Sequence, residues 1–152
     1  MKELIGNKIQ TVEVDKNNQH YLRFNCVEKD GTLSELIYFA EGECCSESWF
    51  SEVLPDWQFE QGNEVVNVEM LEINKISQQI IAADKRTRQE YDEVYGYKVM
   101  DNAGNDLIIV FRNSSNGYYG GWCSLINTDN MVYHKGDLDG VEWQLISNDY
   151  RA

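Results

Sequence analysis

Hydrophobic and polar residues alternate along the first third of the chain with the period of two that is typical of half-buried strands. The segments 8–14, 20–27 and 33–40 each follow this pattern, and the turn-forming stretches "DKNNQ" and "KDG" separate them. In the second segment, for example, Leu22 and Phe24 fall on one face. The sequence therefore predicts an opening three-stranded antiparallel meander.

The same reasoning predicts further strands after residue 60. Gly104 in "DNAGN" is suited to the turn of a hairpin, and "NSSNGYYGG" (113–121) is a second tight connection. Residues 74–93 fit a helix as well as an exposed loop. The strands are expected at 63–73, 95–101, 105–112, 122–127 and 141–146.

One segment, "SESWFSEVL" (46–54), carries the signals of a short helix. Ser46 is a suitable N-cap, Glu47 suits the positive end of the helix dipole, and Pro55 would end the helix. Its apolar residues fall at helical spacing, which favours core packing. The expected fold is α+β and mainly β: one antiparallel sheet of about seven strands with one or two short helices, in a single domain spanning 1–152.

Composition agrees with a globular domain. The 152 residues are 42% hydrophobic, enough to bury a core. The N-terminus lacks the apolar stretch of a signal peptide, and no run has the length of a membrane span. We therefore expect a cytoplasmic protein with reduced thiols.

The charge is strongly acidic. The net charge is −13, and Asp30 to Asn74 contains eleven acidic residues and neither Lys nor Arg. This argues against direct binding to nucleic acid or to an anionic membrane, because both require cationic side chains. An acidic face can serve solubility alone. Alternatively, it can dock a protein partner with a basic surface, such as a nucleic-acid-binding protein.

Two segments together carry a family resemblance. "GECCSESWF" and the hairpin "YKVMDNAGNDLIIVFRNSSNGYYGG" resemble those of small uncharacterised proteins found in phage and bacterial genomes. The match covers about 5–127 and leaves 128–152 as an extension; Glu43 stands where the family has Asp, and Ser115 to Tyr119 match closely. The resemblance implies a compact fold and no known activity. It is compatible with inhibitors of host systems or immunity-type proteins, and a phage-encoded member would be expected in the cytoplasm of the host cell.

Cys44 and Cys45 raise the question of thiol chemistry. A cysteine nucleophile needs a histidine base, and the only histidines are His20 in a turn and His134 in a presumed loop. Neighbouring glutamates disfavour the thiolate. A zinc site formed by Cys44 or Cys45 with Cys123 and His134 is an alternative, but adjacent cysteines rarely share one tetrahedral ion. We favour packing at a strand-to-helix junction, and assign no catalytic residue, metal or cofactor.

The leading hypothesis is a non-enzymatic acidic binding protein that inhibits or neutralises a macromolecular target, either as a phage-encoded antagonist of host defence or as an immunity protein. A thiol-dependent enzyme or redox sensor at Cys44 and Cys45 is the alternative, and a small-molecule binder at the tyrosine turn is the second. The aromatic residues of that turn could equally cover a sheet edge. The residues expected to meet the partner are Glu41, Glu43, Glu47, Glu52, Asp56, Tyr118, Tyr119 and Trp122.

Overall fold

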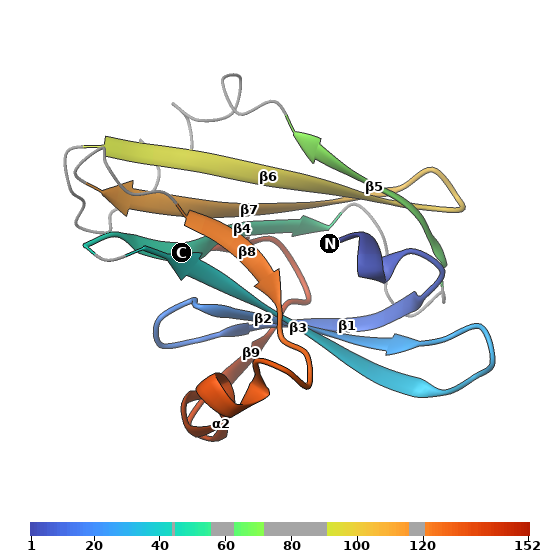
Figure 1. The fold of residues 1–152 in the computed structure, drawn as a ribbon. Coiled ribbons are helices and arrows are strands. Elements are labelled where there is room, and N and C mark those ends of the chain that lie inside the picture. The colour runs from blue at the N-terminus through green and yellow to red at the C-terminus, as the bar shows by residue number, and fades with distance from the viewer. Residues whose placement is uncertain (44, 56–62, 72–90, 116–120) are drawn as a thin grey trace.

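Two five-stranded antiparallel sheets face each other in the computed structural model, which describes residues 1–43, 45–55, 63–71, 91–115 and 121–152 (Figure 1). The first sheet has the order β8–β3–β2–β1–β9 and the second β10–β4–β7–β6–β5. The first consists of β1 (Lys8–Asp15), β2 (Tyr21–Val27), β3 (Leu33–Gly42), β8 (Gly121–Leu125) and β9 (Trp143–Leu145). The second consists of β4 (Glu47–Pro55), β5 (Val65–Leu71), β6 (Tyr91–Asp101), β7 (Asp106–Ser115) and β10 (Tyr150–Arg151). A short 3-10 helix, η1 (Lys2–Leu4), precedes them, and α2 (Met131–Asp139) lies outside the first sheet.

The core lies between the sheets and confirms the mainly β prediction. In the first sheet Val12 pairs with Phe24 and Val14 with Leu22, and all four side chains are buried. The second sheet contributes Phe50, Phe111 and other apolar residues to the same cluster. Burying a side chain of this size stabilises the fold by about 1.5–3 kcal/mol. The expected single sheet of about seven strands is wrong, because the apolar faces pack as two layers.

Three strands share one irregularity, a β-bulge that places two buried residues three positions apart. In β4 the register shifts between Phe50 and Glu52, so Ser51 is the extra residue. A bulge inserts one residue against the partner strand, so the side-chain alternation slips by one position there. The buried residues that lie three positions apart on the same strand are Ile9 and Val12 in β1, Phe50 and Val53 in β4, and Val65 and Val68 in β5.

The helix expected at 46–54 is wrong, because this segment forms β4. The bulge at Ser51 produces the three-residue spacing that suggested a helix. β4 pairs with β7 on one side and with β10 on the other, and Trp49 and Phe50 are fully buried on its two faces. The hydroxyl of Ser46, expected to cap a helix, donates instead to the carbonyl oxygen of Glu43 at 2.8 Å.

Conversely, a helix stands where a loop was expected around His134. None of the residues of α2 is buried, so it has no apolar stripe that a pattern search could find. Tertiary contacts hold it against the first sheet. The ring of His134 packs on Phe39 at 4.7 Å between centroids and lies edge-on to Tyr21 at 5.8 Å.

The predicted hairpin between β6 and β7 is confirmed. Gly104 has a φ of 85°, the left-handed conformation expected of the turn glycine. The buried carboxylate of Asp101 closes the turn by accepting the backbone N–H groups of Ala103 and Asn105. Of the segment that fitted a helix or a loop, 74–90 lies outside the described residues, and 91–93 belongs to β6.

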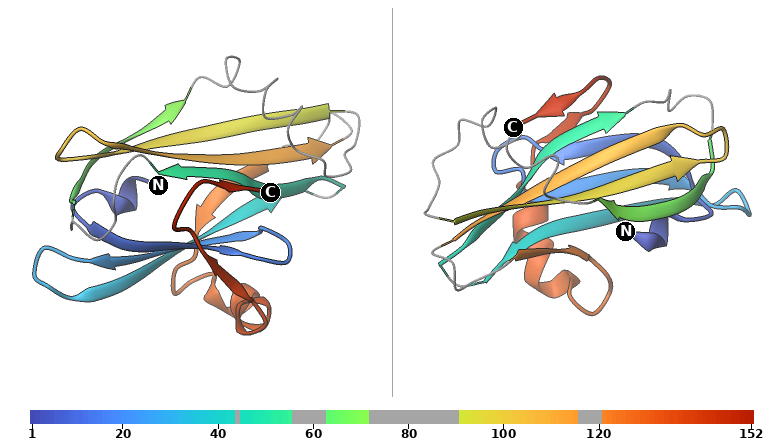
Figure 2. Two further views of the ribbon diagram at one scale, coloured as in Figure 1. Left: turned by 180° about the vertical axis from the view of Figure 1, so that it is seen from behind. Right: turned by 90° about the horizontal axis from the view of Figure 1, so that it is seen from above.

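The C-terminal tail, expected as an extension, supplies an outer strand to each sheet. β9 pairs with β1, which confirms a strand near 141–146, and β10 pairs with β4 (Figure 2). Backbone hydrogen bonds from Ile146 to Val12 and from Ala152 to Ser51 extend both pairings. In the described part of the chain, no helix has the length and apolarity to cross a lipid bilayer.

Candidate functional site

The corner between β3 and β4 is where the chain passes from the first sheet to the second. Gly42 ends β3 and Glu47 begins β4. Within the corner, the N–H of Ser46 donates to the carbonyl oxygen of Glu43 at 2.9 Å. Cys45 adopts a φ of 68°, which is uncommon for a residue with a side chain. The corner is therefore a tight, hydrogen-bonded turn and not the strand-to-helix junction expected from the sequence.

This corner brings together the two segments that carry the family resemblance. Gly42 pairs with Gly121, and Ser48 pairs with Asn113. The amide nitrogen of Asn113 donates to the hydroxyl of Ser48 at 2.9 Å and to that of Ser46 at 3.2 Å. A Cβ atom on Gly121 would lie 2.3 Å from the Ser48 hydroxyl oxygen. Sequence spacing could not reveal this convergence, because about 65 residues separate the partners.

Three of the predicted glutamates lie at this corner, and one of them, Glu41, lies beside an exposed tryptophan. Glu41 and Trp122 are cross-strand partners in β3 and β8. The Glu41 carboxylate accepts the hydroxyl of Ser124 at 2.9 Å, which fixes its orientation along β8. Glu43 and Glu47 are exposed, and the Trp122 side chain is 42% exposed. We call Glu41, Glu43, Glu47 and Trp122 the acidic corner.

The expectation that Glu52 belongs to the same acidic face is wrong. Its side chain is 5% exposed and forms an ion pair with Arg151 of β10 at 2.5 Å. The tail strand therefore removes this carboxylate from the surface. The remaining predicted contacts, Asp56, Tyr118 and Tyr119, lie outside the described residues.

The described cysteines differ in environment. Cys45 is exposed, which does not fit a packing role, and Cys44 lies outside the described residues. Burial raises the pKa of both Cys26 and Cys123 to about 12, so these thiols stay protonated at neutral pH. His134 Nδ1 lies 3.0 Å from the hydroxyl of Tyr21. Among the described residues, no group of three or more His, Cys, Asp or Glu side chains is placed to hold a metal ion.

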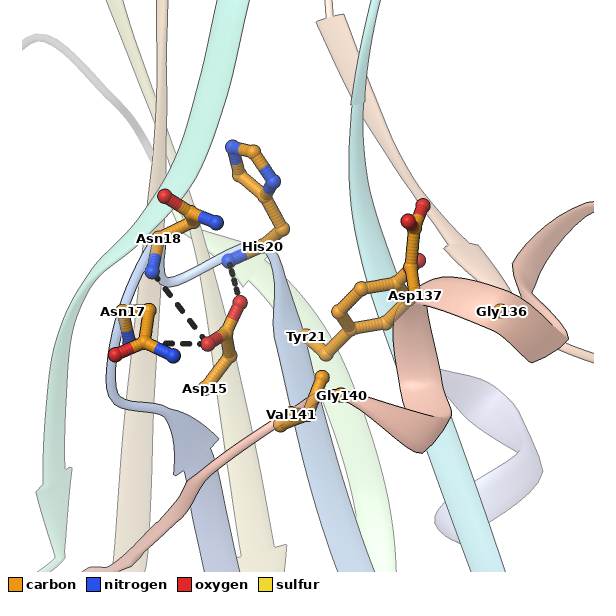
Figure 3. A pocket seen from close by; sticks show the side chains of 9 residues that line it. All are labelled: Asp15, Asn17, Asn18, His20, Tyr21, Gly136, Asp137, Gly140 and Val141. Atoms are coloured by element: carbon orange, nitrogen blue, oxygen red, sulfur yellow. Dashed lines mark hydrogen bonds between the residues drawn. The ribbon is translucent and has the colours of Figure 1, made fainter.

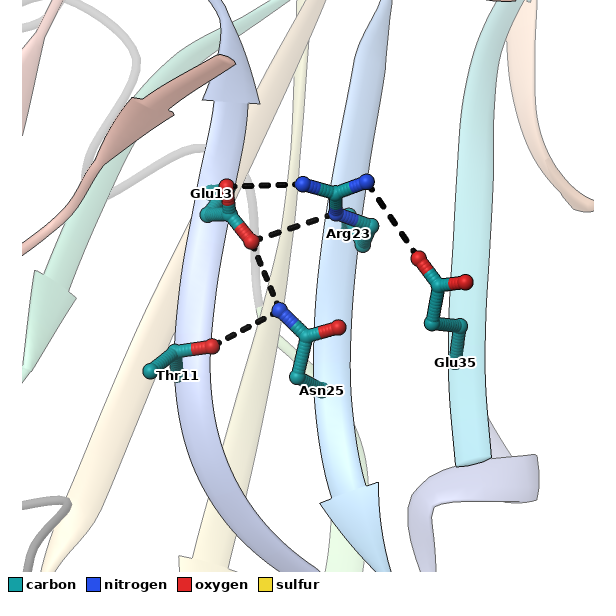
Figure 4. Close-up of polar contacts among 5 residues, drawn as sticks. All are labelled: Thr11, Glu13, Arg23, Asn25 and Glu35. Carbon is teal, nitrogen blue, oxygen red and sulfur yellow. Dashed lines mark hydrogen bonds and ion pairs between the residues drawn. The ribbon is translucent and has the colours of Figure 1, made fainter. Parts of the chain in front are cut away.

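A polar network covers part of the outer face of the first sheet (Figure 4). Arg23 makes two hydrogen bonds to Glu13, at 2.8 and 3.1 Å, and an ion pair with Glu35 at 3.3 Å. Its guanidinium also lies 4.2 Å from the ring centre of Trp143, in cation–π geometry. The network links β1, β2, β3 and β9, so we interpret it as structural.

A pocket that sequence reasoning missed lies between the β1–β2 turn and α2 (Figure 3). It encloses about 440 Å³, within the usual size of small-ligand sites. Asp15 and Tyr21 come from the first sheet, and Asp137 comes from α2. The turn "DKNNQ" was recognisable, but nothing in the sequence placed α2 opposite it. The lining residues are Asp15, Asn17, Asn18, His20, Tyr21, Gly136, Asp137, Gly140 and Val141.

Comparison with known proteins gives a family without an assigned activity. Residues 2–125 match the profile of a domain of unknown function, DUF7448. An uncharacterised protein of Acanthamoeba polyphaga mimivirus is 32% identical over 108 residues, which cover 70% of this chain and 79% of the relative. No solved structure matches the chain significantly.

Proposed function

The chain belongs to the DUF7448 family, whose domain has no known function, and we propose that it is a non-enzymatic binding protein. Its acidic corner binds a basic surface of a macromolecular partner and thereby neutralises that partner. The observation that carries the proposal is the pairing of Glu41 with Trp122. It puts an exposed indole next to one carboxylate, and the exposed Glu43 and Glu47 follow in the same corner of the chain.

The charge distribution supports this role through the kinetics of association. A net charge of −13 produces a long-range field that attracts a basic partner and repels nucleic acid. Glu43 and Glu47 are exposed at one corner, so they can guide the approach of the partner. Exposed charges of this kind increase the association rate and the specificity more than the affinity.

Trp122 supplies apolar contact area, which the carboxylates lack. Tryptophan is enriched among the residues that dominate binding energies, because it buries a large apolar area when a partner covers it. Trp122 lies in β8 at the edge of the first sheet, and Gly121 beside it is held by the contacts of the corner. The anchor is thus placed on a rigid element, which lowers the entropy cost of binding.

The biological setting is part of the proposal. A protein of this kind suits a phage-encoded antagonist of a host defence system or an immunity protein that masks a toxin. The viral relative supports a viral or mobile-element setting. The basic target in such systems would include nucleases and other nucleic-acid-binding proteins.

The test compares capture by three proteins from a lysate of the source organism at low salt. The wild type, a corner variant (E43K/E47K) and a distal variant (E28K/E69K) are immobilised. All four glutamates are exposed, and both variants change the net charge equally. We expect one basic protein to be retained by the wild type and the distal variant and lost from the corner variant. Its association rate with the corner variant should fall by on the order of tenfold, a difference that salt abolishes.

Two outcomes would contradict the proposal. If both variants lose the partner equally, net charge and not the corner determines binding. If Trp122→Ala leaves the dissociation rate of the captured partner unchanged, the indole is not an anchor.

A second candidate function, thiol chemistry at Cys45, is favoured by the exposure of that side chain in a left-handed backbone conformation. In a Cys44→Ser background, Cys45 should react with iodoacetamide in the native state. Buried Cys26 and partly buried Cys123 should react far more slowly, because the pKa of each thiol is raised to about 12. A Cys45 alkylation rate well above that of free cysteine would support an activated thiol. A rate at or below that of free cysteine would contradict this second function.

A further inference from the structure

We propose that the pocket between the β1–β2 turn and α2 binds an alkylammonium group, the cationic end of a small diamine or of a lysine side chain. The pocket shares no residue with the acidic corner, so this inference does not depend on the function proposed above. It rests on the shape of the pocket, on its charge and on the chemistry of its walls.

The shape of the pocket leaves room for a short chain. The β1–β2 turn forms one wall and the last turn of α2 forms the other, as Figure 3 shows. Gly136 contributes no side chain to the wall of α2, and a Cβ atom added there would meet no other atom within 4 Å. The volume of about 440 Å³ is therefore open space.

Three features give the pocket a negative potential. The Asp15 carboxylate, almost completely buried, is held in place by the backbone N–H groups of Asn17 at 3.0 Å and of Asn18 and His20 at 3.4 Å. A carboxylate has about four acceptor positions, so it can accept a further donor. Asp137 provides an exposed second carboxylate, and the C-terminal end of α2 adds the negative end of its dipole.

The phenol in the wall of the pocket responds to this potential. Burial, and then the charges of Asp137 and Asp15, raise the pKa of Tyr21 to about 12. Both carboxylates therefore act on the Tyr21 hydroxyl. Among the residues that the structure describes, neither Lys nor Arg lines the pocket, and Lys16 in the adjacent turn forms an ion pair with Glu142 at 3.3 Å.

The walls favour an organic cation over a metal ion. Val141, which is partly exposed, provides apolar surface against which methylene groups can pack, and the almost completely buried Tyr21 lies behind it in the wall. The exposed amides of Asn17 and Asn18 can accept ammonium N–H groups beside the two carboxylates. In the described part of the chain, no group of three or more potential ligands is placed to coordinate a metal. An alkyl chain that ends in an ammonium group matches the apolar and the acidic part of the pocket at once.

The test is a titration of the full-length protein followed by the amide signals of its NMR spectrum. The probes are 1,5-diaminopentane, a lysine-containing tripeptide and the neutral analogue pentan-1-ol. We expect saturable shifts at Tyr21, Gly136 and Gly140 with the two ammonium probes and none with the alcohol. Tighter binding of the diamine would identify a free amine as the ligand, and tighter binding of the tripeptide would identify a lysine of a partner.

Variants in α2 separate this site from general attraction by the acidic protein. Asp137→Asn should weaken binding of the diamine by about twofold to fivefold, the effect of a partly exposed ion pair. Asp139→Asn is the matched control, because Asp139 is exposed in the same helix but does not line the pocket. The affinity of this variant for the diamine should equal that of the wild type. Gly136→Leu should abolish binding by filling the space, with amide signals elsewhere preserved. The absence of saturable shifts, equal weakening by Asp137→Asn and Asp139→Asn, or equal binding of the alcohol would overturn the proposal.

Discussion

The hydroxyl of Tyr21 lies 3.0 Å from Nδ1 of His134, and this hydrogen bond joins β2 to α2. Because α2 buries none of its own residues, the contacts of His134 are central to its position. Removing the hydroxyl in Tyr21→Phe should lower the free energy of unfolding by about 0.5–1.5 kcal/mol. It should also accelerate amide hydrogen exchange throughout α2. Tyr133→Phe removes an exposed hydroxyl from the same helix, and it should change neither measurement.

The two carboxylates that bind Arg23 should contribute unequally to stability. Glu13 is 17% exposed and makes two hydrogen bonds to the guanidinium, whereas Glu35 is 55% exposed and makes one ion pair. Glu13→Gln should therefore lower the free energy of unfolding by about 1–3 kcal/mol, as for a charge-assisted hydrogen bond. Glu35→Gln should cost less than about 1 kcal/mol, because solvent screens an exposed pair. Urea denaturation of both variants checks the order, and equal losses would contradict the structural role of Glu13.

Gly121 should tolerate no side chain. An added Cβ atom would lie 2.3 Å from the Ser48 hydroxyl and 2.6 Å from the Asn113 amide nitrogen. Gly121→Ala should thus lower the free energy of unfolding by about 1–3 kcal/mol through overpacking. The second substitution Ser48→Gly should restore part of this loss. The matched control is Gly136→Ala in α2, where space is open; it should stabilise the protein by about 0.5–1 kcal/mol. A neutral effect of Gly121→Ala would mean that the corner can rearrange.

Stability should fall steeply in alkaline solution. Burial raises the pKa of Cys26 and Cys123 from 9.0 to about 12, and that of Tyr21 from 10.0 to about 12. Between these values the unfolded chain loses protons that the folded chain retains. The free energy of unfolding therefore decreases as the pH rises from about 9 to about 12 and is unaffected by these groups below that window. Urea midpoints measured from pH 7 to 11 check this. In Cys123→Ala the decrease should be shallower; an unchanged slope would exclude Cys123 as a contributor.

The sequence predicted most strands because regular alternation survives in them. The segments that became β2, β3, β6 and β7 were recognised as strands, although β6 and β7 run several residues beyond the predicted hairpin. β4 was misread because its bulge places Phe50 and Val53 at helical spacing. α2 was missed for the opposite reason, since its stability comes from contacts of His134 that depend on distant residues. Hydrophobic periodicity indicates which local positions are buried. It indicates neither a bulge in a strand nor a helix held by tertiary contacts.

The candidate site was predictable only in part. Acidic composition pointed to Glu41, Glu43 and Glu47; the structure places all three at the corner between β3 and β4 and pairs Glu41 with Trp122. Glu52 has the same sequence signal, yet its partner Arg151 lies about 99 residues away and comes from the tail. The pairing of distant segments determines which carboxylates face solvent, and one-dimensional charge counts do not contain that information.

The tail supplies β9 and β10, and these two edge strands couple the stability of one sheet to that of the other. Only residues 146–149 separate β9 from β10, and Ile146 between them is buried in the shared core. If β9 detaches from β1, β10 loses the short tether that keeps it against the outer edge of β4. The exposed borders of both layers should consequently open and close as one cooperative event, so that a single proteolytic nick before residue 143 would uncover strand edges on both halves of the molecule at once.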